Sequence, residues 1–95
     1  MPTPTHRVGE AAAGVASILL SLLLKGNPDA KLVFEYTNWR GEKRTRKVAP
    51  FRVWYGATEW HPVPQMLLEG YCHDAMDKRD FAIADINIST LQVTD

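Results

Sequence analysis

The chain has little of what several classes of protein require. Cys72 is the only cysteine among 95 residues, which excludes a disulfide framework and a paired-cysteine metal site. The 11 basic and 11 acidic residues cancel, which argues against a general nucleic-acid coat protein. No internal repeat, glycine-rich phosphate loop or nucleophile-elbow serine is present. These scarcities leave one small globular domain spanning residues 1–95, which we expect to be cytoplasmic.

The residue types that could carry catalysis or bind a metal are not arranged for either task. Cys72 and His73 are neighbours, and adjacent side chains of a strand point to opposite faces, so they cannot form a nucleophile–base pair. Glu59, His61 and Asp74, together with His73, match no metal-ligand spacing. We therefore predict no enzymatic activity, no metal and no cofactor. We expect His61 to pack against its proline-rich loop and His73 to be exposed.

The longest apolar run covers residues 11–24 and is too short for a bilayer, which requires roughly 20 residues. Its spacing predicts instead a helix over 8–25 that Gly26 and Pro28 end. The predicted buried face comprises Val15, Ile18, Leu19, Leu22 and Leu23. Two further leucines, Leu20 and Leu24, widen the apolar stripe beyond what one small sheet covers. The surplus predicts a second partner surface, with a homodimer through this helix as one candidate and no membrane contact.

After Pro28 the apolar period changes from helical to alternating, which is typical of strands. The pattern predicts strands near 31–38, 42–48, 51–55, 66–74 and 79–86. Pro50 is expected to end the second strand, and Pro62 and Pro64 place residues 56–65 in a loop. The predicted fold class is therefore α+β, with an N-terminal helix and a strongly bent, five-stranded antiparallel β-barrel over 31–93.

Basic residues are concentrated in "RGEKRTRKVAPFR", residues 40–52, which holds six of the 11 in the chain against one acid, Glu42. In a strand, Arg44 and Arg46 lie on one face about 7 Å apart, close to the phosphate spacing of a single nucleic-acid strand. Aromatic residues suited to base stacking are interleaved: Trp39, Trp54, Tyr55 and Trp60. The alternative interpretation is that these rings are core and these arginines protect a solvated strand edge.

The order of several short motifs resembles the WYL domain, a bacterial and phage ligand-binding module with an Sm-like β-barrel. The likeness runs from about Lys31 to Val93. It is carried by Tyr36, "RGE" (40–42), the Arg46-x-Val48-x-Pro50 step, Trp60, "LLEGYC" (67–72) and "RDFAIADI" (79–86). The name-giving tripeptide is interrupted here, because "HPVPQM" follows Trp60 and Leu67 stands in place of the tyrosine.

This resemblance implies a stand-alone, non-catalytic regulatory module that binds nucleic acid, expected to be single-stranded, or a nucleotide. The ligand would occupy a basic, aromatic-rimmed groove. By position, Arg79 would be the pocket arginine and Arg46 the next match, whereas Arg44 and Arg52 are added from the charge pattern alone. The four arginines would neutralise phosphates while Trp60 stacks a base. An alternative role for Arg79 is a structural ion pair with one of the nearby aspartates, Asp77, Asp80 or Asp85.

Two other functions stay open on the sequence. In the first, the protein is an interaction module that docks a bacterial or phage regulatory factor through its N-terminal helix, with the barrel as scaffold. In the second, it senses a small molecule. We rank that function last, because a small barrel has little room beyond its own side chains.

Overall fold

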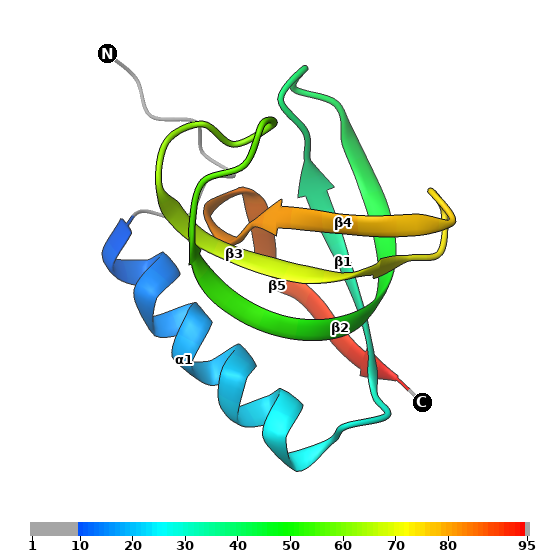
Figure 1. Ribbon diagram of the computed structural model, residues 1–95. Helices are drawn as coiled ribbons and strands as arrows, with labels where there is room; N and C mark the ends of the chain where they lie inside the picture. The colour runs from blue at the N-terminus through cyan, green and yellow to red at the C-terminus, as the bar shows by residue number, and fades with distance from the viewer. Residues whose placement is uncertain (1–9, 95) are drawn as a thin grey trace.

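The computed structural model describes residues 10–94 of the chain, with side chains from residue 14 onward. One helix is followed by five strands and a short 3-10 turn, so the α+β class is confirmed (Figure 1). In chain order the elements are α1 (Glu10–Gly26), β1 (Lys31–Thr37), β2 (Lys43–Gly56), β3 (Gln65–Cys72), β4 (Asp77–Ala82), η1 (Ile83–Asp85) and β5 (Ile86–Thr94). Within residues 10–94, no helix is long and apolar enough to cross a membrane.

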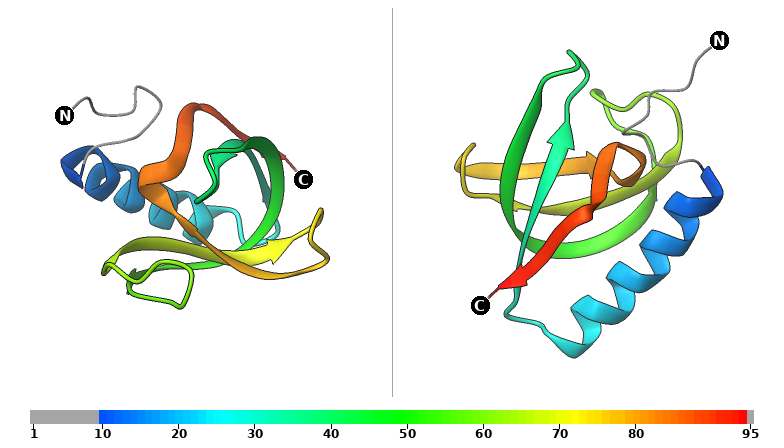
Figure 2. Two further views of the ribbon diagram at one scale, coloured as in Figure 1. Left: turned by 90° about the horizontal axis from the view of Figure 1, so that it is seen from above. Right: turned by 180° about the vertical axis from the view of Figure 1, so that it is seen from behind.

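The five strands form one antiparallel sheet in the order β4-β3-β2-β1-β5. The sheet is strongly curled, as Figure 2 shows from above and from behind. Among the described residues, β4 and β5 are the two edges and do not pair with each other. An antiparallel sheet of five strands was therefore predicted correctly, whereas closure into a barrel is not observed.

The prediction that Pro50 ends a strand is wrong, because β2 continues through this residue as a single strand of 14 residues. The register of β2 against β3 shifts between Pro50 and Arg52, and a bulge of this kind tolerates the missing N–H of proline. Gly70 pairs with Pro50 across the bend. A Cβ built on Gly70 would lie 2.6 Å from the carbonyl oxygen of Ala49, so only glycine permits this close approach.

The strand predicted over 79–86 is in fact divided. β4 ends at Ala82, the turn η1 takes the chain around a corner, and β5 then runs back beside β1. The sequence pattern missed β5 because it carries polar residues on both sides, with only Ile86 fully buried. The total of five strands is correct only because β2 was divided in two.

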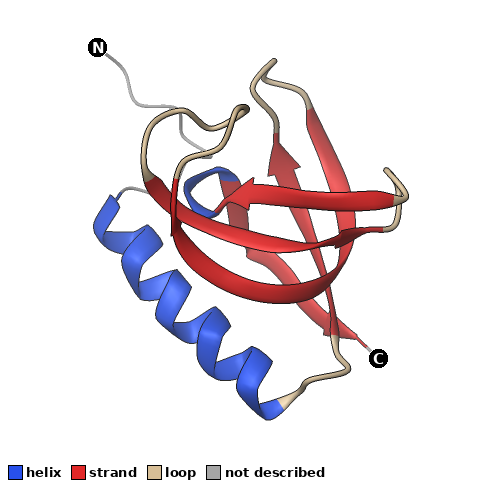
Figure 3. Cartoon of the chain, viewed as in Figure 1, coloured by secondary structure: helices blue, strands red, loops and turns tan. Residues whose placement is uncertain are grey.

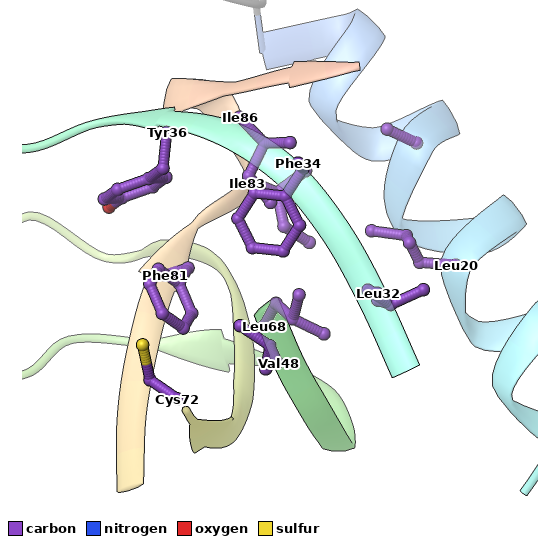
Figure 4. Packing of buried hydrophobic residues seen from close by; sticks show 11 residues of the cluster. Leu20, Leu32, Phe34, Tyr36, Val48, Leu68, Cys72, Phe81, Ile83 and Ile86 are labelled. Carbon is purple, nitrogen blue, oxygen red and sulfur yellow. The ribbon is translucent and has the colours of Figure 1, made fainter. Parts of the chain in front are cut away.

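The core lies inside the curl of the sheet and is rich in aromatic rings. Phe81 packs edge to face against Phe34 and Tyr36, with ring centroids 5.5 and 5.0 Å apart. Figure 4 shows that Leu20 and Leu32 fill the end of the core next to α1, whereas Tyr36, Phe81 and Cys72 lie at the other end. Val53 is half-buried against this cluster, and four further apolar residues are buried in it: Val48, Phe81, Ile83 and Ile86.

The orientation of α1 differs from the prediction. The helix ends at Gly26 as expected, while its predicted start at residue 8 lies outside the described residues. Ala16, Ser17 and Leu20 face the sheet, with Leu23 and Leu24 half-buried beside them. Most of the predicted buried face is exposed instead: Val15, Ile18, Leu19 and Leu22. Because the run is apolar on nearly every side, its pattern could not rank the faces, and the small side chains at 16 and 17 allow the closer approach to the sheet.

Candidate ligand-binding pocket

Two loops, β1–β2 and β2–β3, lie at the same end of the curled sheet (Figure 3). Residues of both loops and of β4 line a pocket of about 390 Å³. We call it the loop-end pocket. Its wall brings together side chains that are far apart in the chain: Tyr36, Trp39, Arg46, Trp60, Arg79 and Phe81. Three of the five predicted binding residues, Arg46, Trp60 and Arg79, are therefore neighbours in space.

The floor of the pocket is the polar end of the aromatic core. Tyr36 and Phe81 line the pocket and are nearly fully buried. The hydroxyl of Tyr36 accepts a hydrogen bond of 3.0 Å from the backbone N–H of Ala82. This N–H belongs to the edge strand β4, so the bond ties β4 to β1 across the mouth of the curled sheet. The floor is thus held in place by side-chain packing and by one long-range hydrogen bond.

Arg46 projects from β2 into the pocket with only 17% of its side chain exposed. It stands opposite Phe34 in the β1–β2 register, so its stem covers the core. Its Nη1 lies 4.0 Å from Oδ2 of Asp74, at the outer limit of an ion pair. Its Nε is buried and has no hydrogen-bond partner among the described residues. A buried donor left unpaired costs free energy, so this guanidinium is poised for an acceptor.

Arg79 projects from β4, where it pairs across the sheet with Gly70, and its side chain lines the pocket. Its Nη1 lies 3.0 Å from Oδ2 of Asp77, and both side chains are about half exposed or more. An ion pair in that setting contributes little stability and is easily exchanged for another anion. Arg79 is thus both a pocket residue and one member of an exposed ion pair with one of the aspartates named from the sequence.

The rim carries two tryptophans, Trp39 at 70% and Trp60 at 65% exposure, so the interpretation of these two rings as core is wrong. Trp39 follows Asn38, whose side-chain oxygen accepts hydrogen bonds from the N–H groups of residues 40 and 42 and shapes the turn. Trp60 lies in a loop closed by reciprocal backbone hydrogen bonds between Thr58 and His61. Both rings are therefore held at the rim by ordered turns.

His61 connects the β2–β3 loop to β4. Its Nε2 lies 3.0 Å from the carbonyl oxygen of Asp80, which holds the neighbouring Trp60 over the pocket. His61 was predicted to pack against its proline-rich loop; its backbone closes that loop, but its ring reaches β4 instead. His73 is exposed as expected. No group of three or more metal-ligating side chains occurs within the described part of the chain.

Arg44 and Arg52 do not line the pocket. Arg44 is exposed on β2 opposite Tyr36, beyond the pocket wall. Arg52 lies on the other face of the sheet, where its Nε donates to Oε1 of Glu69 at 3.0 Å and its guanidinium covers the ring of Trp54. The hydrogen bond from Arg52 lowers the pKa of the Glu69 carboxyl more than burial raises it.

Several pocket residues were not assigned to the site from the sequence. Tyr36 and Phe81 carry the apolar alternation of a strand, which is the same signal as ordinary core. Asp74, the ion-pair partner of Arg46, is the last residue of a predicted strand, and nothing in its spacing connects it with Arg46. Cys72 lines the pocket wall but is buried against the core. Only the strand register brings these residues together.

Comparison with known proteins gives one match. The family model described as the WYL domain matches residues 29–91, which covers all of β1 to β4 and part of β5 and leaves α1 outside. The resemblance read from the sequence is thereby confirmed. No curated protein and no solved structure matches the chain.

Proposed function

This chain belongs to the WYL domain family of generally regulatory, ligand-sensing and non-catalytic modules, and on that premise we propose that its loop-end pocket binds a nucleotide or one unit of single-stranded nucleic acid. The observation that carries the proposal is the guanidinium of Arg46 in the pocket wall, whose buried Nε has no hydrogen-bond partner within the described part of the chain. A phosphate oxygen is an acceptor that would satisfy this group with a charge-assisted hydrogen bond. Arg79 supplies a second cation in the wall of the same pocket.

The dimensions of the pocket favour a ligand of nucleotide size. A volume of about 390 Å³ lies within the range of small-ligand sites and is too small for a duplex. The pocket lies at the mouth of the curled sheet rather than inside it, so the argument that a small barrel has no room for a ligand does not apply. A phosphate would contact Arg46 and Arg79, and the base would extend towards the rim.

The exposed rings of Trp60 and Trp39 are the candidates for stacking that base. Stacking of a base on an aromatic side chain contributes about 1–3 kcal/mol and tolerates different bases. Leu67, which replaces the family tyrosine, is fully buried and pairs with Ala82 and Trp54, so it offers no ring to the pocket. We therefore assign the stacking role to Trp60, with Trp39 as its neighbour.

The salt dependence of binding reports the number of phosphate contacts. Two contacts by Arg46 and Arg79 predict a slope of log K against log salt of roughly −1.4 for a single strand. If Arg44 and Arg52 also contact phosphates of the nucleic acid outside the pocket, the four contacts predict a slope of roughly −3. The slope therefore distinguishes a pocket that captures one unit from a longer basic track.

The test is a fluorescence anisotropy titration of a labelled single-stranded oligonucleotide at low and moderate salt, with an unlabelled nucleoside monophosphate as competitor. Arg46→Ala, Arg79→Ala and Trp60→Ala are expected to weaken binding at least tenfold. Arg52→Ala is the matched control, because it removes the same charge from the opposite face of the sheet. Equal losses in Arg46→Ala and Arg52→Ala, or no binding at low salt by the folded protein, would refute the pocket as the site.

One observation favours the second candidate function, a protein interaction module that docks through α1. Four large apolar side chains of this helix face solvent, and they lie outside the family match. Pocket variants would then leave the regulatory activity intact, whereas α1 variants would abolish it.

The Sm-like barrel implied by the family also remains a hypothesis. It predicts slow amide hydrogen exchange along the outer edges of β4 and β5, which an open sheet leaves to solvent.

A further inference from the structure

The outward face of α1 is apolar over two turns. Val15 is 59% exposed, Ile18 63%, Leu19 60% and Leu22 62%. The opposite side of the helix, with Ala16 and Leu20, is buried in the core. The helix is therefore apolar on both sides, although a helix on the surface of a monomer normally has a polar outer face. A contiguous apolar face of this kind marks an interaction surface.

The apolar surface continues from α1 onto the sheet. A shallow groove beside the helix is lined by Ile18 and Leu22 on one side and by Val53 and Met66 on the other. Its helix wall carries small residues at three positions, Gly14, Ser17 and Ser21, which leave space for an incoming side chain. Tyr55, opposite Met66 in the β2–β3 register, extends the apolar surface further.

The exposed side chains of α1 are arranged symmetrically along the helix. Val15 and Leu22 are equally distant from the midpoint between Ile18 and Leu19. A two-fold interface requires that residue i contacts j and that j contacts i, and this spacing satisfies the requirement for two antiparallel helices. Val15 of one copy would meet Leu22 of the other, and Ile18 would meet Leu19.

Charge along α1 selects the same arrangement. No charged residue occurs between Glu10, the first residue of the helix, and Lys25 in its last turn. In an antiparallel pair, the Lys25 residues of the two copies lie at opposite ends of the contact, and the helix dipoles oppose each other favourably. A parallel pair would instead bring the two Lys25 residues together.

We propose that the protein is a homodimer in which α1 packs antiparallel against α1 of a second copy about a two-fold axis. Because α1 lies at the end of the sheet away from the loop-end pocket, both pockets stay open in the dimer (Figure 1). One pair of helices about 25 Å long buries less than a standard interface of about 800 Å² per partner, so the dimer dissociates at micromolar concentration.

The first experiment is sedimentation equilibrium of the full chain over a range of concentrations. The expected mass rises from the 10.7 kDa of the monomer to twice that value. Ile18→Glu and Leu22→Glu should keep the chain monomeric, because each places two unpaired carboxylates in an apolar contact. Val63→Glu is the matched control, since Val63 is equally exposed but lies in the β2–β3 loop, and it should dimerise like the unmodified chain.

The antiparallel register has its own test. A mixture of Val15→Cys and Leu22→Cys chains should form a disulfide-linked pair on mild oxidation, because these two positions meet in the antiparallel register. In a parallel dimer, each variant would instead cross-link to its own copy. A chain that stays monomeric at every concentration, or captures a different protein through α1 without self-association, would overturn the proposal. Ile18→Glu should bind the oligonucleotide as well as the unmodified chain does, and Arg46→Ala should still dimerise, so failure of either proposal is seen separately.

Discussion

Nη1 of Arg46 lies 4.0 Å from Oδ2 of Asp74, while Nε of the same guanidinium is buried and has no hydrogen-bond partner among residues 10–94. The Asp74 carboxylate interacts with Nη1 of the guanidinium, and the Nε–H donor still needs a hydrogen-bond acceptor. Asp74 itself is about half exposed, so it contributes weak electrostatic compensation. The side chain is thus positioned for an anion, and its incomplete pairing carries a cost in the ligand-free protein.

Replacement of Arg46 by methionine should separate stability from binding. A buried, poorly paired guanidinium is exchanged for an apolar side chain of similar length, so we expect the ligand-free stability to stay equal or to rise by about 1 kcal/mol. Urea unfolding measures the change, and the anisotropy titration should show lost binding in the same variant. A loss of about 2 kcal/mol or more in stability would mean that Arg46 is a structural residue.

The hydrogen bond from Ala82 N–H to the Tyr36 hydroxyl should be visible in stability. Tyr36→Phe keeps the ring packing against Phe81 but removes the acceptor, which leaves a buried N–H of an edge strand unpaired. The expected cost is about 1–3 kcal/mol in urea unfolding. Tyr55→Phe, at an exposed ring of the same type, serves as control and should change stability by less than about 0.5 kcal/mol.

Gly70 should not tolerate even a methyl group. A Cβ at this position would lie 2.5 Å from Cγ1 of Val48 and 2.6 Å from the carbonyl oxygen of Ala49, at the bend of β2. We expect Gly70→Ala to destabilise the protein by about 1–3 kcal/mol, because the backbone on one side of the contact cannot move freely. Gly14→Ala should instead raise the midpoint of thermal unfolding. The added Cβ meets no atom within 4 Å, and alanine favours the helix more than glycine does inside α1.

The Arg52–Glu69 pair should make stability depend on pH in the acidic range. The pKa of Glu69 is lowered in the folded protein, chiefly by the hydrogen bond from Arg52. A lowered folded pKa stabilises the protein at pH values above the unfolded pKa of about 4.5, and this contribution is lost as pH falls through the folded value. The difference between the urea midpoints at neutral and at acidic pH should therefore be smaller in Glu69→Gln than in the unmodified chain. An unchanged pH dependence would show that the pair does not contribute.

The sequence pattern was sufficient for local structure and for part of the site. Alternating apolar residues predicted β1 and the core positions of β4, and Gly26 marked the end of α1. It failed where two physical effects compete at one residue. Pro50 normally ends a strand, but a bulge opposite Gly70 accommodates it, and no local signal announces that bulge. The polar residues of β5 hide a strand that exists because β1 offers it a free edge.

By itself the sequence determined the fold class, the membership of the WYL family, the concentration of basic residues at 40–52 and an excess of apolar residues on the first helix. Which arginines share a pocket was decided only by the tertiary structure. Arg46 and Arg79 are 33 positions apart and meet because β2, β3 and β4 are neighbours in register, whereas Arg52 is turned to the opposite face after the bulge. The direction of α1 was likewise decided by packing, since a helix that is apolar on both sides buries whichever face approaches the sheet most closely.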